Sequence, residues 1–213
     1  MKIAGVVSTK EAKFGPIIYK GDLEENIKKL AKLGYDGVEM ASRDPGQIDK
    51  NKLREVLKES GISLSSIATG QAALMDSLTF TNPEEKVRER AVKRIMEQID
   101  FAAEFSAPVI IGLVKGNLPD APKKDEALGW VIDACGRCAD FAEEKGMDIF
   151  IEAINRYEAN WLNTILEGKD LLEKLNRDNI LLHIDTYHMN IEEVSFGDSI
   201  LEAGSLIGYV HLV

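Results

Sequence analysis

Apolar, β-branched runs of five to eight residues alternate along the chain with longer stretches whose apolar residues recur at helical spacing. This alternation predicts seven strands with a helix between each pair. The expected strands cover residues 2–8, 37–41, 63–70, 108–114, 148–154, 179–185 and 209–213. The expected helices cover residues 22–34, 51–61, 82–105, 126–146, 163–176 and 196–206.

Two of these helices begin with recognisable capping residues. Asp22 is placed to accept hydrogen bonds as the N-cap of the first helix, and Gly34 suits the left-handed position just after its end. Asn82 and Pro83 open the third helix in the same way, as cap and first-turn proline. The helix boundaries are therefore predicted from specific residues as well as from periodicity.

Regular alternation of strands and helices predicts an α/β fold with a parallel sheet covered by helices. The strands are apolar on both faces, as a sheet buried on both sides requires. No GxGxxG follows the first strand, which disfavours an open dinucleotide-binding sheet. We therefore expect a TIM (β/α)8 barrel, truncated after the seventh strand. Residues 1–213 would form a single barrel domain without the seventh helix and the eighth βα unit. Its unpaired edges invite association, so we expect a homo-oligomer.

Charge and composition argue against some classes of binding partner. The chain has 26 Lys and Arg against 36 Asp and Glu, a net charge of −10, which argues against a nucleic-acid partner. No apolar run has the length of a secretory or membrane segment, so we expect a cytoplasmic protein without a membrane partner. Cys135 and Cys138 form a CxxC without a second pair or a nearby histidine, and we expect them to face the core from a helix.

The last three expected strands each carry a side chain that can bind a metal. These are Glu152, Asp185 and His211, separated by 33 and 26 residues, about one strand–helix unit each. Singly, each has an ordinary alternative as a buried ion pair or a packed histidine. Together they point to the carboxyl end of a barrel, where active sites lie. Their mixed oxygen and nitrogen donors suit a divalent metal ion, Mn²⁺ first, with Mg²⁺ or Co²⁺ as alternatives.

Three segments of the chain resemble a known family. They are IEAINRYEANWLNT (151–164), HIDTYHMNIEE (183–193) and YVHLV (209–213). They resemble the xylose-isomerase-like sugar isomerases and epimerases, and within them the ketose 3-epimerases that act on D-tagatose or D-psicose. The likeness extends over the whole chain, including residues 69–92 and 110–116.

The resemblance implies a metal-dependent sugar isomerase or epimerase with a small-molecule sugar substrate. It implies that Glu152, Asp185 and His211 bind the metal, that Glu152 also transfers a proton through a metal-stabilised enediolate, and that Glu158 and His188 contact the sugar. In that family a glutamate on an eighth strand is a further ligand and the second base. Because no such strand follows in this sequence, we expect the chain alone to show little epimerisation.

Other functions remain open from the residues. An aldose–ketose or hydroxypyruvate-type isomerase would use the same metal chemistry, and a truncated barrel could bind metal without turnover. An apurinic-site endonuclease shares the fold, but its zinc cluster demands many histidines and the chain has three.

Four more residues have two possible roles each. Glu39 either reaches the pocket or pairs with a cation on the helix side, and His183 either packs or supports the site. Phe14 and Tyr19, in the loop after the first strand, are candidates for an apolar wall of the pocket.

Overall fold

The strands of the protein form one parallel sheet. The structure, a computed structural model, describes residues 1–8, 17, 19–119 and 123–213. Within these residues eight strands pair in the order β2-β1-β3-β4-β5-β6-β7-β8, and every pair is parallel. They are β1 (Ala4–Ser8), β2 (Tyr19–Lys20), β3 (Gly37–Ala41), β4 (Ser63–Ala68), β5 (Val109–Ile111), β6 (Ile149–Glu152), β7 (Ile180–Asp185) and β8 (Ile207–His211).

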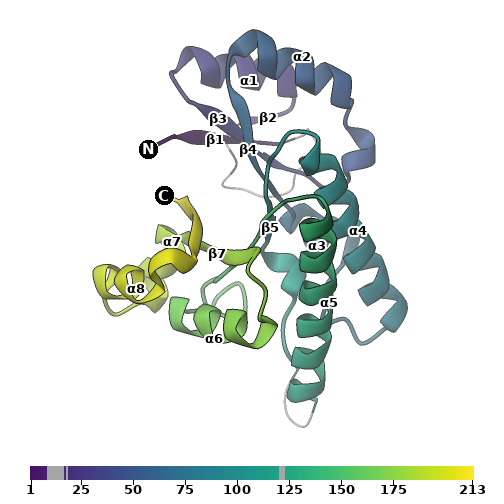
Figure 1. Ribbon diagram of the computed structural model, residues 1–213, viewed down its shortest axis with the longest axis vertical. Helices are drawn as coiled ribbons and strands as arrows, with labels where there is room; N and C mark the ends of the chain where they lie inside the picture. The colour runs from purple at the N-terminus through teal and green to yellow at the C-terminus, as the bar shows by residue number, and fades with distance from the viewer. Residues whose placement is uncertain (9–16, 18, 120–122) are drawn as a thin grey trace.

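Helices connect the strands and cover the outside of the curled sheet (Figure 1). They are α1 (Leu23–Lys32), α2 (Lys50–Ser60), α3 (Gly70–Asp76), α4 (Glu85–Ala103), α5 (Lys124–Glu144), α6 (Ile165–Leu175), α7 (Thr186–Glu192) and α8 (Phe196–Ala203). Short 3-10 helices are η1 (Pro45–Gln47), η2 (Leu113–Lys115) and η3 (Gly204–Leu206). Neighbours pack in chain order, α1 against α2, α4 against α5, α5 against α6, and α6 against α8.

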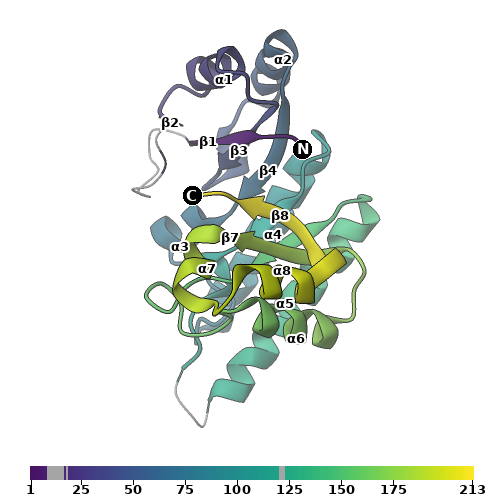
Figure 2. The same cartoon turned by 90° about the vertical axis from the view of Figure 1, so that its left-hand side faces the viewer.

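This architecture confirms the expected fold class, an α/β TIM-type barrel that is open. The strands β2 and β8 stand at the two ends of the sheet, and no described strand joins them. Figure 2 shows β1 and β8 on the same side of the molecule, with β8 running past β7. At this open edge Val210 and Leu212 are 44% and 73% exposed, so apolar surface lies next to unpaired backbone.

Most element boundaries agree with the sequence, and the differences have local causes. Asp22 does cap α1 by accepting from Glu25 N, and Gly34 adopts a φ of +88° after its end. The prediction of Asn82 as a helix cap was wrong: its side chain accepts from the N–H of Glu84, and α4 begins only after Glu84. The two-residue β2 and the seven-residue helices α3 and α7 were not predicted, because such short elements carry no readable periodicity.

The core fills the space between the sheet and its outer helices. All five residues of β3 are buried, as are the three of β5. Cys135 and Cys138 are fully buried free thiols on α5, which confirms their expected packing role. No helix in the described part of the chain is long and apolar enough to cross a membrane.

Candidate active site and metal centre

The three expected metal ligands end three neighbouring strands. Glu152 is the last residue of β6, Asp185 of β7 and His211 of β8. The strand register pairs Glu152 with His183, and Asp185 with His211. Because paired residues in a sheet point to the same face, these side chains all enter the inside of the curled sheet. The topology thus brings Glu152 and His211, which are 59 residues apart in the sequence, to the same face of the sheet.

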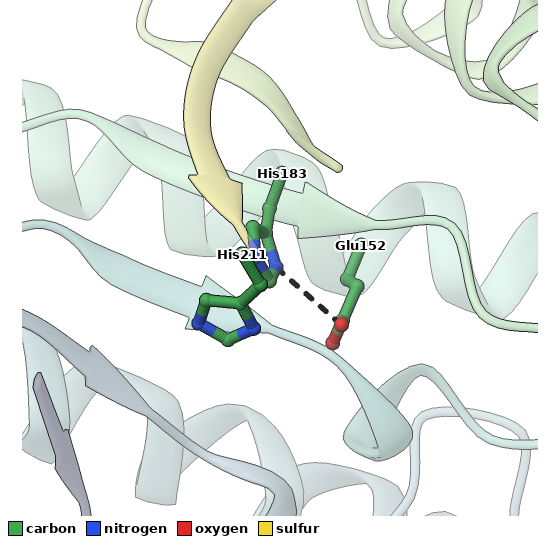
Figure 3. Close-up of side chains that lie close together, drawn as sticks. All are labelled: Glu152, His183 and His211. Carbon is green, nitrogen blue, oxygen red and sulfur yellow. Dashed lines mark ion pairs between the residues drawn. The ribbon is translucent and has the colours of Figure 1, made fainter. Parts of the chain in front are cut away.

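The distances inside this cluster are short. His183 Nδ1 lies 3.5 Å from Glu152 Oε1, and His211 Nδ1 lies 3.5 Å from Asp185 Oδ2. Figure 3 shows the side chains of Glu152 and His183 pointing at each other, with His211 beside them. Ligand atoms of Glu152, His183 and His211 all lie within 4.8 Å of one another, and so do those of Glu152, Asp185 and His188. The described residues therefore contain a possible metal site, and the ligand role of each remains a prediction.

Buried negative charge is the dominant electrostatic feature of the cluster. Glu39 is 2% exposed and Asp185 8%, and Glu152 has ligand atoms within 4.8 Å of those of Asp185 and of all three histidines. Burial lowers the pKa of His211, but the Glu39 and Asp185 carboxylates beside it raise that pKa to about 11. A protonated His211 therefore supplies positive charge among three carboxylates. A divalent cation meets the same need, since buried carboxylates are stable only when paired or coordinated.

The imidazole of His183 and the carboxylate of Glu152 are in the forms that suit coordination. Burial lowers the pKa of His183 to about 4, so its ring is neutral, and neither ring nitrogen makes a hydrogen bond to any described residue. Burial alone would raise the pKa of Glu152, but the surrounding imidazoles lower it to about 2, so the carboxylate is ionised. A neutral imidazole and ionised carboxylates are the forms that bind metals.

Glu158 and His188 lie on the same side of the cluster. His188 belongs to α7, is 8% exposed and places Nε2 3.5 Å from Glu152 Oε1. Glu158 lies in the loop after β6, and an ion pair between Arg156 Nη2 and Glu192 Oε2, at 2.6 Å, ties that loop to α7. The helix itself starts where Asp185 Oδ1 accepts from Tyr187 N at 2.7 Å. One carboxylate thus caps α7 and faces His211.

A single large cavity connects these groups. It has a volume of about 1370 Å³ and is lined by the site residues Glu152, Glu158, Asp185, His188 and His211. Residues of β1 and β8 line it as well, so it extends along the open side of the sheet and exceeds the usual size of a ligand pocket. Tyr19 also lines it, as expected, whereas Phe14 lies outside the described residues.

The sequence left the role of Glu39 undecided and gave no prediction for Lys115. Glu39 takes the pocket side, where it accepts from Ser66 Oγ at 2.7 Å and lies 2.9 Å from His211 Nε2. Lys115 on η2 is fully buried, and its Nζ has no hydrogen-bond partner among the described residues. Burial lowers the pKa of Lys115 to about 8, while Glu152 and Glu158 favour its charged form. A lysine in an otherwise apolar run was the only sequence signal for it.

Comparisons with known proteins agree with this geometry. The family model described as xylose isomerase-like TIM barrel matches residues 27–213. An L-ribulose 3-epimerase of Methylomonas sp. is 36% identical over 202 residues, which cover 92% of this chain and 70% of that protein. A D-psicose 3-epimerase of Agrobacterium fabrum is 33% identical over 211 residues, which cover 94% of this chain and 67% of the relative.

Solved structures are similar over the whole chain. The crystal structure of D-allulose 3-epimerase from Methylomonas sp. in complex with D-allulose superimposes with a TM-score of 0.80 at 30% identity. The match covers 100% of this chain and 73% of that one. This chain therefore spans about three quarters of the solved relative, and the matched part includes every candidate site residue.

Proposed function

The chain belongs to the xylose isomerase-like TIM barrel family, and from this premise we propose that it is a metal-dependent ketose 3-epimerase. The main support is that Glu152, Asp185 and His211 end three neighbouring strands. Glu152 also shares one group of closely spaced ligand atoms with His211 and another with Asp185. Relatives named for epimerisation of L-ribulose and D-psicose support carbon 3 of a free ketose as the reacting centre.

The donor set suits a hard or borderline divalent cation. We assign Glu152, Asp185 and His211 as its protein ligands, with Mn²⁺ as the metal and Mg²⁺ or Co²⁺ as alternatives. When bound, such a cation supplies a Lewis acid that stabilises negative charge on an oxygen beside the reacting carbon. The carboxylate of Glu39 lies 2.9 Å from His211 Nε2 and so fixes the orientation of the imidazole, whose Nδ1 faces Asp185.

Proton transfer falls to Glu152. Its ionised carboxylate can accept the proton from the carbon next to the sugar carbonyl and return a proton to the same face. Glu158 offers a carboxylate that accepts from sugar hydroxyls, and His188 offers a ring nitrogen at the cavity wall. Inversion also needs a proton donor on the other face of the carbon, whereas exchange of the proton with solvent needs only the Glu152 face.

The partner we propose is a small neutral sugar, which the cavity accommodates. We also propose that copies of the chain associate, because Val210 of β8 and Leu212 just after it are exposed along the open edge of the sheet. Light scattering on the purified chain tests this: a homogeneous monomer at high concentration would contradict it.

Solvent exchange in heavy water tests the function. The chain is incubated with Mn²⁺ and L-ribulose, D-psicose or D-fructose, and nuclear magnetic resonance then locates incorporated deuterium. Deuterium at carbon 3 is expected for a 3-epimerase, and deuterium at carbon 1 would instead favour an aldose–ketose isomerase. If metal binds and neither carbon exchanges, the proposed function is wrong.

Three variants assign the roles. Glu152→Gln should lower exchange by roughly 10²- to 10⁴-fold, the usual contribution of a general base. His188→Ala should weaken binding of the sugar and leave the metal content nearly normal. Loss of metal in this variant would mean that His188 is a ligand. Glu104→Gln is the matched control, because Glu104 makes only exposed ion pairs to Lys50 and Arg54.

A further inference from the structure

Asn155 connects the two residues that we assign to sugar binding. It lies three residues after Glu152 and is fully buried. Its Nδ2 lies 2.9 Å from Glu158 Oε1 and 2.7 Å from His188 Nδ1. Its Oδ1 accepts from Tyr157 N at 2.9 Å. One buried amide thus touches a carboxylate, an imidazole and the backbone.

These partners determine which way the amide faces. In the opposite orientation, the amide oxygen of Asn155 would face the carboxylate of Glu158, and its NH₂ would face the N–H of Tyr157. Both contacts would be repulsive, since a carboxylate only accepts and a backbone N–H only donates. Nδ2 is therefore the group that points to Glu158 and His188, and it has one hydrogen for each.

The amide orientation determines the proton position on His188. A nitrogen that receives a hydrogen bond from Asn155 must present its lone pair, so Nδ1 carries no proton. The ring proton then sits on Nε2, on the side of Glu152. A second proton, on Nδ1, would face the amide hydrogens of Asn155.

We propose that Asn155 is a positioning residue that keeps the proton of His188 on Nε2 and holds the carboxylate of Glu158 in place. The site then offers sugar hydroxyls one oriented donor, His188 Nε2–H, and one oriented acceptor, Glu158. The sugar-binding consequence rests on the proposed function, but the proton position does not.

The proton position can be measured directly. The chain has three histidines, so ¹⁵N-labelled protein gives few ring signals, and assignment by His→Gln substitution at each position is practical. The spectra are recorded with Mg²⁺, because paramagnetic Mn²⁺ or Co²⁺ would broaden them. We expect His188 to show a protonated Nε2 and an unprotonated Nδ1. A protonated Nδ1 in the wild-type protein would overturn the proposal without need of any variant.

Substitution of the amide tests the cause. Asn155→Asp replaces the donor with a carboxylate oxygen, so the signal of His188 Nδ1 should move to that of a protonated nitrogen. Asn155→Ala should leave a mixture of the two tautomers. A His188 spectrum unchanged in both variants would refute the role of Asn155. The control is Asn163→Asp, since Asn163 Nδ2 donates only to the backbone oxygens of Ile154 and Ala159, at 2.6 and 2.8 Å.

The sugar consequence is tested separately. If the exchange assay gives activity, Asn155→Ala should raise KM for the sugar by about 3- to 10-fold, the value of one oriented hydrogen bond, with a smaller change in kcat. An altered tautomer with an unchanged KM would mean that the proposed sugar contact is wrong while the positioning is right. Absence of exchange in the wild type would count against the proposed function alone.

Discussion

Gly112→Ala is a small change that should displace the carboxylate of Glu152. Gly112 lies between β5 and η2, and a Cβ placed on it would lie 2.6 Å from Glu152 Oε2. Comfortable Cβ contacts begin near 3.4 Å, so the oxygen would have to retreat by roughly 0.8 Å. The other oxygen, Oε1, lies 3.5 Å from both His183 Nδ1 and His188 Nε2, so these contacts resist the movement.

The expected loss follows from the tolerance of metal sites. Ligand distances vary by about 0.2 Å around their ideal values, and a displacement near 0.8 Å is several times larger. Changes just outside the ligands typically cost 10- to 100-fold in metal affinity, and we expect Gly112→Ala to fall in this range. Isothermal titration calorimetry with Mn²⁺ measures the affinity, and unfolding in urea shows whether the fold survives.

The matched control is Gly129→Ala on α5. A Cβ at Gly129 meets no atom within 4 Å, so the helix should gain about 0.5–1 kcal/mol and metal affinity should be unchanged. If Gly112→Ala binds Mn²⁺ as tightly as the wild type, Glu152 either is not a ligand or moves freely, and the proposed metal centre would have to be revised.

Three further predictions concern the same interior. Glu39→Gln should weaken Mn²⁺ binding by roughly 10- to 100-fold in calorimetry, because it alters the group at His211 Nε2, whereas Ser66→Ala, which removes only the other partner of Glu39, should cost less. In the metal-free protein the pKa of His211 is raised from 6.5 to about 11, so its pairing stabilises the fold fully below pH 6.5 and is lost as the pH rises toward 11. Urea unfolding should therefore show that His211→Phe loses less stability at pH 10 than at pH 6, and an equal loss at both would contradict the pairing. Burial raises the pKa of Cys135 to about 12 and that of Cys138 well above its usual value, so both thiols should react with a thiol reagent much more slowly in the folded chain than in urea.

Three successive strands, each with a side chain that can bind a metal, were the part of the site that the sequence predicted. Glu152, Asp185 and His211 were recognisable because each lies in an apolar run on one of three successive expected strands, and parallel strands bring such positions to one end of a barrel. Glu39 could not be assigned to a side, because every residue of β3 is buried and the run shows no alternation. Only the register of β3 against its neighbours decides which face a side chain takes.

Contacts between loops were beyond sequence reasoning. The bond of Asn155 to His188 depends on how the loop after β6 meets α7, which no local pattern encodes. Lys115 was hidden for a related reason: η2 turns it inward, although a lysine is almost always exposed.

The order of the strands in the sheet also determines when, during synthesis, the site residues can come together. From β4 to β8, each strand pairs with the one made just before it, so the sheet can grow one unit at a time as the chain leaves the ribosome. His211 lies on the last strand and reaches back to Glu39, made 172 residues earlier. The proposed metal centre is therefore complete only when β8 has docked. Binding of metal by the nascent chain would report that β8 has docked, since a nascent chain that stops before His211 lacks this imidazole.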